Sequence, residues 1–368
     1  MKNFITEIKI GKVRHLENID IKLGNEKKHL ILTGKNGSGK TSLLKNIHEL
    51  LLSNFYRKPI EYILGLHIIY SNEILYDFYN KDKKFIYAFF KAPRTINNID
   101  KSTHAEKIIF PKEKTAKLNK LFIRYMVGLK IERAFAKDDG ELELVETLDR
   151  WFDNFENILR KIFNDNSLAL KFDRNPFSYN FRVEIDGKEP FDFYTMSAGY
   201  SAIMDIVTEL ILKIENTKSK SFDCEGIVLI DEVDNHLHVE LQKNILPLLT
   251  NFFPNIQFIV TTHSPFVLSS LSNSVVYDLE KQLRVEDLSG YSYDSLIESY
   301  FDSDKYSKEV KEKIEIFEKL ADRDDLTDNA KDEYYKLKKY FDSLPTFMSD
   351  ELAVKLNEIK LRNMFKAT

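Results

Sequence analysis

The period of the hydrophobic positions changes several times along the first 56 residues. Apolar and polar residues alternate across 3–23, most clearly at Ile19–Leu23, and a period of two predicts strands. The apolar run Leu30–Leu32 predicts a short buried strand, and apolar residues at helical spacing predict a helix over 42–56. We therefore expect a buried strand, a polar loop and a helix in succession.

Similar patterns return in the second half of the chain. The runs Ile227–Ile230 and Phe258–Thr262 predict two more buried strands. Helices are expected from about Ser201 to Ile214 and from Phe266 to Leu271, with a strand at Val275–Leu279. Buried strands that alternate with helices predict an α/β fold with a mixed or parallel sheet.

Residues 57–179 break this pattern and are expected to form an insertion, part core sheet and part helical. In chain order its expected elements are strands at 62–70 and 84–90, a helical stretch from about 113 to 163, and a hairpin of 167–173 with 179–185. The expected domains are a core of 1–56 and 180–285, the insertion, and a charged helical C-terminal region, 286–368.

The loop at residues 34–41 carries the most informative motif, GKNGSGKT, which fits G-x-x-x-x-G-K-[ST]. Backbone N–H groups of 36–41 can converge on the β- and γ-phosphates of ATP, because glycines allow the close approach. Lys40 is expected to neutralise phosphate charge, and the Thr41 hydroxyl to ligate Mg²⁺. The alternative is a plain glycine-rich turn. The residues expected to bind the nucleotide here are Gly34, Asn36, Gly37, Ser38, Gly39, Lys40, Thr41 and Ser42.

Two acidic residues follow the predicted strand at 227–230. The ends of parallel strands lie at the sheet edge where open α/β folds bind ligands. We expect Asp231 to hold Mg²⁺ and Glu232 to accept a proton from the attacking water. Without the phosphate loop, an acidic turn after a core strand would be an equally good interpretation.

Two further strings occur in a fixed order with these motifs. Met196–Tyr200 precedes the helix expected from Ser201, and Thr261–Pro265 (TTHSP) follows the last buried strand. Together the four motifs resemble the ABC-type ATPases, in particular the soluble SMC/RecF-like branch. The resemblance implies a P-loop NTPase head, with ATP and Mg²⁺ as cofactors.

The resemblance also implies roles for residues that composition and spacing leave open. Ser197 and Gly199 are expected to contact the γ-phosphate of ATP held by a second copy, which makes a homodimer or higher oligomer the expected assembly. The alternative is an ordinary Ser-capped helix start. His263 is expected to contact the γ-phosphate and the attacking water, which would make Glu232, His263 and Lys40 the catalytic set. Arg14 is expected to lie near the nucleotide.

The chain departs from the family in places. Met196, Ala198 and Tyr200 replace the usual Leu, Gly and Gln, and no Gln lies between the phosphate loop and this string. Phe89–Arg94 is our candidate substitute for the missing glutamine. Residues 234–238 resemble the family's D-loop, which we prefer over a metal site formed by its two histidines, His236 and His238.

Composition limits the remaining classes. A net charge of −4 gives no support for binding nucleic acid over the whole surface, and a hydrophobic fraction of 43% suffices for a large core. The one cysteine, Cys224, and the lack of a signal-like or membrane-spanning run make a cytoplasmic protein the expectation. One helix face is either a nucleic-acid contact or, more simply, a solvated face; it carries Lys114, Lys117, Lys120 and Arg124.

The string Tyr291–Phe301 resembles the tail of bacterial anti-phage defence ATPases of the Septu/retron-associated group. That resemblance implies a separate nuclease partner, such as an HNH protein. Asp302–Asp304, a D-x-D string of the tail, is expected to be a loop rather than a nuclease site. The alternatives are a RecF-like ATPase that binds DNA in repair and, less favoured, the ATP-binding subunit of a transporter.

Overall fold

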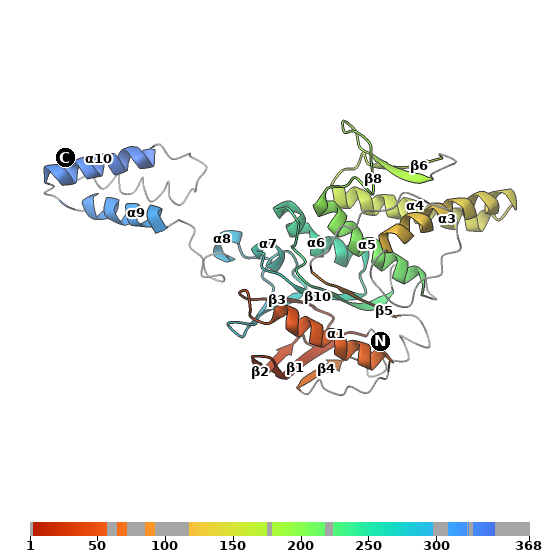
Figure 1. Ribbon diagram of the computed structural model, residues 1–368, viewed down its shortest axis with the longest axis horizontal. Coiled ribbons are helices and arrows are strands. Elements are labelled where there is room, and N and C mark those ends of the chain that lie inside the picture. The colour runs from red at the N-terminus through yellow and green to blue at the C-terminus, as the bar shows by residue number, and fades with distance from the viewer. Residues whose placement is uncertain are drawn as a thin grey trace. The chain divides into compact units, whose positions relative to one another are not determined.

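A computed structural model of the chain describes residues 3–56, 65–71, 85–92, 118–174, 179–217, 224–296, 308–321, 323 and 327–342. The chain divides into two compact units, Met1–Tyr291 and Ser292–Thr368. Figure 1 shows the elements of each. The first unit contains the four motifs that resemble those of the ABC-type ATPases, and its sheets determine where those motifs meet.

A six-stranded sheet forms the centre of the first unit, in the order β12-β11-β3-β10-β9-β5. All neighbours pair in parallel except β11 and β12, which are antiparallel. The strands are β3 (His29–Thr33), β5 (Phe85–Phe90), β9 (Glu225–Ile230), β10 (Ile256–Thr261), β11 (Ser274–Asp278) and β12 (Leu283–Glu286). The expectation of an α/β fold with a mixed, largely parallel sheet is therefore confirmed.

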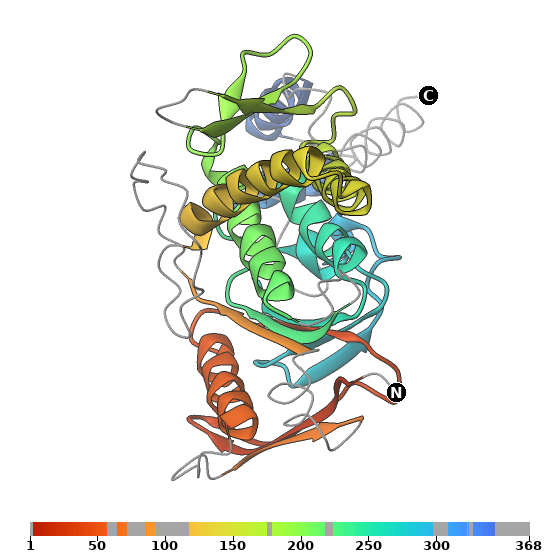
Figure 2. The same ribbon diagram turned by 90° about the vertical axis from the view of Figure 1, so that its right-hand side faces the viewer.

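A second, antiparallel sheet lies below the first in Figures 1 and 2, with helix α1 (Lys40–Tyr56) between the two. Its strands, in the order β2-β1-β4, are β1 (Ile5–Val13), β2 (Leu16–Lys22) and β4 (Leu66–Tyr70). Leu43, Leu44 and Ile47 of α1 are fully buried in one core with residues from both sheets. Burial of this apolar helix face, at roughly 25 cal/mol per Å², holds the two sheets together.

Helices cover the opposite face of the large sheet (Figures 1 and 2). They are α5 (Ala198–Glu215), α6 (Val239–Phe252) and the short α7 (Pro265–Leu268). The insertion adds α3 (Leu118–Asp138) and α4 (Leu142–Phe163), of which α3 packs on α5 and α4 packs on α6. A small antiparallel sheet follows, with strands β6 (Ala169–Asp173), β7 (Asn180–Glu184) and β8 (Phe191–Asp192).

Aromatic side chains join the insertion to the helix α5. Trp151 of α4 stacks on Phe155 at 5.6 Å between ring centroids and meets Tyr125 of α3 edge-on at 5.7 Å. The Trp151 indole N–H donates to the Glu215 carboxylate at the end of α5, with 3.1 Å between Nε1 and Oε1. The apolar side of α4 between Trp151 and Ile162 is therefore a packing face.

The sequence predictions and the structure differ at several boundaries. The helix expected over 266–271 stops at Leu268, because the Ser269 and Ser270 hydroxyls donate to the carbonyls of Pro265 and Val267 and close the turn. Helix α5 begins three residues earlier than expected. Strand β12 was not predicted, since its alternation is short and all its residues except Val285 are exposed.

The described part of the second unit contains α8 (Tyr293–Ser295), α9 (Lys308–Ala321) and α10 (Asp328–Asp342). Phe317 of α9 stacks on Tyr334 of α10 at 5.0 Å, so the apolar sides of these two helices pack together. Several predictions fall on residues that the structure does not describe: the D-x-D at 302–304, Lys114, Lys117, and the residues Pro93 and Arg94.

The six-stranded sheet and the β2-β1-β4 sheet are also joined by the buried side chain of Gln257, on β10. Its Oε1 accepts from the Ile5 amide at 2.7 Å, and its Nε2 donates to the Ile5 and Lys28 carbonyls at 2.9 and 2.8 Å. One side chain thus satisfies a donor on β1 and acceptors on both sheets. Buried backbone groups without partners cost free energy, so this glutamine has no apolar substitute.

Replacing Gln257 with Leu should lower the free energy of unfolding by about 2–4 kcal/mol, because three buried backbone groups lose their partner. Urea unfolding followed through the fluorescence of Trp151, the one tryptophan of the chain, measures this loss. The control is Asn244→Leu on the exposed side of α6, where a change within about 0.5 kcal/mol is expected. Equal losses in the two variants would contradict the bridging role.

Candidate nucleotide site

The parallel strands bring three motif segments and the turn after β11 to one edge of the large sheet. Gly34 follows β3, Asp231 follows β9, Thr262 follows β10 and Leu279 follows β11. Because these strands are parallel neighbours, their carboxyl ends lie side by side. The segments are separated by up to 245 residues in the chain, and the sheet alone makes them a single site.

The loop after β3 folds around the side chain of Lys40. The buried Lys40 ammonium donates to the Gly34 and Lys35 carbonyls, with Nζ–O distances of 2.7 and 3.0 Å. The loop closes through a Ser38 N–H bond to the Lys35 carbonyl at 3.1 Å. The ammonium is thus held at the N-terminus of α1, the helix end that attracts anions.

Gly39 is required by its conformation and by its neighbours. Its φ of +96° lies in the left-handed region. A Cβ there would lie 3.1 Å from Leu16 Cδ1 and 3.3 Å from His15 Cε1, so the turn between β1 and β2 packs directly on the loop. Arg14 occupies the same turn with φ +56° and is exposed. The structure therefore brings the turn of Arg14 to the loop. The residue of this turn adjacent to Gly39 is His15, which was not predicted as a site residue.

Two buried hydroxyls at the loop have no hydrogen-bond partner among the described residues: Thr33 Oγ1 and Ser38 Oγ. Buried polar groups are normally satisfied, so unsatisfied ones next to a glycine-rich loop call for a ligand with hydrogen-bonding oxygens. With the Lys40 ammonium and the helix N-terminus, the residues present fit a phosphate group.

Asp231 is the buried acid of the site, and its Oδ1 accepts two hydrogen bonds. One comes from Thr41 Oγ1 at 3.1 Å and the other from Thr261 Oγ1 at 2.7 Å. A carboxylate beside a hydroxyl at the start of the phosphate-loop helix is the kind of oxygen donor set that Mg²⁺ takes in proteins. The donor set therefore fits this ion. Thr261 was missed as a site residue, although it opens the TTHSP string.

Glu232 is held by contacts of its backbone and of its side chain. Its φ is +48°, in the left-handed region, and its N–H donates to Thr261 Oγ1 at 2.7 Å. Asn235 Nδ2 donates to the Glu232 carboxylate, 3.4 Å from Oε2. A non-glycine residue kept at positive φ by two neighbours stores backbone strain, which is common at functional positions.

His263 lies among the charged groups of the site. Burial lowers the pKa of His263, the Lys40 charge lowers it further, and Asp234 and Glu232 oppose the shift. The imidazole is therefore neutral at pH 7 and carries one N–H donor. The neighbouring Thr262 Oγ1 donates to Asp234 Oδ1 at 2.6 Å, which ties the end of β10 to the turn after β9.

The string Met196–Tyr200 begins helix α5, with Ser197 as its N-cap residue. The exposed Ser197 side chain makes no capping hydrogen bond, so the structure does not support the alternative of an ordinary Ser cap. Gly199 is buried against the turn after β9: a Cβ there would lie 3.0 Å from Leu241 Cδ1 and 3.2 Å from the His236 carbonyl. Tyr200 stacks on Phe163 of α4 at 4.2 Å between ring centroids.

The proposed substitute for the missing glutamine lies at the end of β5. Phe90 pairs with Ile230, and its carbonyl accepts from the Asp231 amide at 2.8 Å. Lys91 is therefore the residue beside Asp231 at the sheet edge, although its Nζ lies over the Phe89 ring, 5.6 Å from the centroid. No group of three or more His, Cys, Asp or Glu side chains in the described ranges could hold a metal, and that includes His236 and His238.

Comparison with known proteins identifies the family to which this chain belongs. A family model described as "AAA domain, putative AbiEii toxin, Type IV TA system" matches residues 46–269, more than half of the chain. The chain belongs to this AAA domain family. The matched segment begins after the phosphate loop and contains the acidic pair, the TTH string and all of α3 to α6.

Individual relatives match parts of the chain. The Septu protein PtuA of Bacillus mycoides is 26% identical over 75% of this chain and 40% of its own length. The retron Ec83 probable ATPase of Escherichia coli is 34% identical over 35% of this chain and 26% of its own. The chain thus spans less than half the length of these relatives.

Among solved structures, an Smc head bound to the C-terminal winged-helix domain of ScpA aligns with a TM-score of 0.41 and 13% identity. The alignment covers 75% of this chain and 94% of that one.

None of the helices in the described ranges is both long enough and apolar enough to span a bilayer.

The electrostatic arrangement predicts how His263 titrates. Replacing Lys40 with Met removes a cation that disfavours protonation of the imidazole, so the pKa of His263 should rise towards its ordinary 6.5. NMR titration of the histidine Cε1 protons measures this shift. His48 is the control, because burial, Glu49 and Lys91 set its lowered pKa without Lys40. A His263 pKa that does not move would place Lys40 too far away to act on it.

Proposed function

We propose that this chain binds ATP with Mg²⁺ at the carboxyl edge of its large sheet and hydrolyses it. The observation that supports this most directly is the contact between Thr41 of the phosphate loop and Asp231 after β9. A buried lysine, a helix N-terminus and an acid–hydroxyl pair meet at one point, which is the arrangement that phosphoryl transfer requires.

Each residue takes a role from its position. Lys40 exchanges its bonds to the Gly34 and Lys35 carbonyls for phosphate oxygens. Thr41 and Asp231 would hold Mg²⁺, which supplies positive charge to the phosphate oxygens when bound. Glu232 accepts the proton of the attacking water, and the neutral His263 donates its N–H to a phosphoryl oxygen.

We further propose that two copies share each nucleotide. Ser197 is exposed and makes no capping bond, so its hydroxyl and the first amides of α5 are free to bind an anion presented by another molecule. Gly199 fixes this helix start against the turn that follows Glu232. A two-fold dimer would then place the α5 N-terminus of one copy over the phosphate loop of the other.

The third proposal concerns what the ATPase controls. The relatives named as a Septu protein and as a retron ATPase support a role in anti-phage defence. We assign cleavage to a separate nuclease effector whose action follows opening and closing of the dimer, as the resemblance to the Septu/retron-associated group implies.

Replacing Glu232 with Gln should lower ATP turnover by about a hundredfold or more while nucleotide binding persists, because only the proton acceptor is lost. With ATP and Mg²⁺ the variant should accumulate as a dimer, as measured by sedimentation velocity. Glu232→Gln combined with Ser197→Arg should stay monomeric, whereas Glu232→Gln with Ala134→Arg, on an exposed face of α3, should dimerise normally. Rapid hydrolysis by Glu232→Gln would remove the assigned base, and a trapped dimer despite Ser197→Arg would remove the shared site.

The purified chain alone should leave plasmid DNA intact, while its co-expression with the product of the neighbouring open reading frame should protect cells from phage. Lys40→Ala should abolish that protection, because nucleotide binding drives the switch. Plaque counts on matched strains measure the effect. Tight ATP-dependent capture of DNA ends by this chain alone, with no effect of the neighbouring gene, would favour the RecF-like alternative instead.

A further inference from the structure

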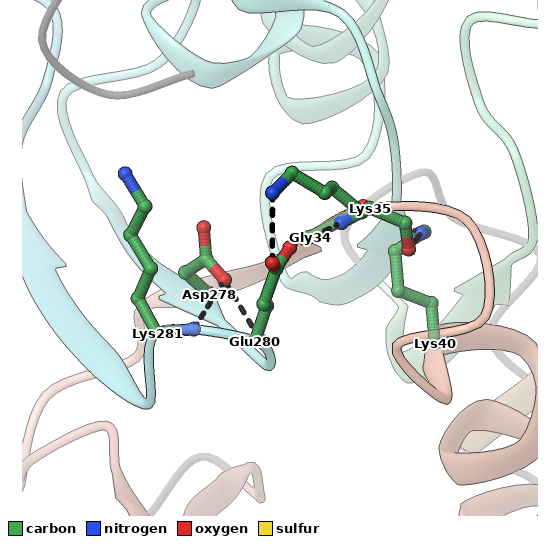
Figure 3. Close-up of polar contacts among 6 residues, drawn as sticks. All are labelled: Gly34, Lys35, Lys40, Asp278, Glu280 and Lys281. Carbon is green, nitrogen blue, oxygen red and sulfur yellow. Dashed lines mark hydrogen bonds and ion pairs between the residues drawn. The ribbon is translucent and has the colours of Figure 1, made fainter. Parts of the chain in front are cut away.

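The turn that joins β11 to β12 is fastened to the strand that carries the phosphate loop. The Leu279 amide donates to the Thr33 carbonyl at 3.0 Å, directly before Gly34. The buried Asp278 shapes the turn, since its Oδ1 accepts from the amides of Glu280 and Lys281 at 2.8 and 3.0 Å (Figure 3). The first residue of the turn is therefore hydrogen-bonded to the residue directly before the phosphate loop.

Glu280 extends from this turn to the loop and contacts it twice. Its Oε1 accepts from Lys35 Nζ at 3.0 Å, and its Oε2 accepts from the Lys35 backbone amide at 3.3 Å. The pKa of Glu280 is lowered, first by the hydrogen bond from the Lys35 side chain and further by that from the backbone amide. The carboxylate is thus charged at neutral pH and holds the second residue of the loop from outside.

The backbone around Lys35 links Glu280 to Lys40. The Gly34 carbonyl precedes the Lys35 N–H and the Lys35 carbonyl follows it, and both carbonyls accept from Lys40 Nζ. Fixing the Lys35 amide fixes the peptide plane that contains the Gly34 carbonyl. The order of contacts is therefore Glu280, then the Gly34–Lys35 peptide, then the ammonium that faces the nucleotide site.

We propose that Glu280 is a positioning residue of the phosphate loop: it presets the Gly34–Lys35 peptide and thereby the position of Lys40. The effect of Glu280 on nucleotide affinity rests on the proposed function. The ordering of the loop by Glu280 concerns the ligand-free protein alone. An exposed ion pair contributes little to global stability, so the effect is confined to the loop.

A competing explanation makes the opposite prediction. Glu280 is a negative charge near the place where a triphosphate binds. If it acted only through its field, any neutral replacement would tighten nucleotide binding, and Ala and Gln would be equivalent. If it positions the loop, Ala should weaken binding, and Gln, whose amide oxygen can still accept the Lys35 N–H, should recover part of the loss.

The first measurement is amide hydrogen exchange of residues 34–40 in the ligand-free protein. Glu280→Ala should speed exchange in this segment about three- to tenfold, and Glu280→Gln should speed it less, because one acceptor remains. Glu286→Ala is the matched control: Glu286 lies on β12 and pairs with Lys28 and Arg284, away from the loop. Loop exchange that is unchanged by Glu280→Ala, or raised equally by Glu286→Ala, overturns the proposal.

The second measurement is equilibrium binding of a fluorescent ATP analogue, together with turnover at saturating ATP. Glu280→Ala should raise the Kd about three- to tenfold with kcat unchanged, since the loop is reordered once nucleotide is bound. Tighter binding in both Glu280→Ala and Glu280→Gln overturns the positioning role in favour of the field alone. A wild-type chain that binds no nucleotide refutes the proposed function, whereas the exchange measurement still decides whether Glu280 orders the loop.

Discussion

The hydrogen bonds that converge on Asp231 Oδ1 are the constraint from which the site follows. Thr41 supplies one from the first turn of α1, and Thr261 supplies the other from the end of β10. Thr261 also accepts from the Glu232 amide, so three segments that are distant in sequence are fixed within a few ångströms of one another. A shift of any of them would misplace a hydroxyl, an acid and a strained turn together.

The positive charge of Lys40 is compensated before any nucleotide is present. The buried Lys40 lies near four carboxylates, Asp231, Glu232, Asp234 and Asp278, each of which raises its pKa against the larger effect of burial. Its ammonium is satisfied by two loop carbonyls in the meantime. An incoming phosphate therefore displaces backbone acceptors and does not have to order a solvated side chain, which lowers the entropic cost of binding.

The sequence predicts well what depends on neighbours in the chain. The strand, loop and helix around residues 30–56 are local, and the runs at 227–230 and 258–262 are long enough to define buried strands. Ser197 could be placed at a helix start, but whether it caps that helix depends on geometry that the residue types do not determine. Helix α7 was overestimated because two serine hydroxyls compete with its backbone.

What the sequence does not predict depends on contacts across the sheets. Gln257 contacts Ile5 across 252 residues, and Glu280 contacts Lys35 across 245. Neither belongs to a motif, and each becomes informative only when the fold places β11 beside β3 and brings the start of β10 to β1. Thr261 is an intermediate case, since it belongs to the recognisable TTHSP string, in which only the histidine was predicted to be a site residue. Motifs thus predict the groups that touch a ligand better than the groups that hold them in place.

The stacking of Tyr200 on Phe163 connects the start of α5 to the end of α4. Phe163 is the last residue of α4, and the other end of that helix, at Leu142, forms the turn with α3 where Phe135 and Leu142 are 64% and 68% exposed. With 22 residues, α4 is a continuous rod of about 33 Å. The exposed turn between α3 and α4 is therefore joined to the first turn of α5 by one continuous helix.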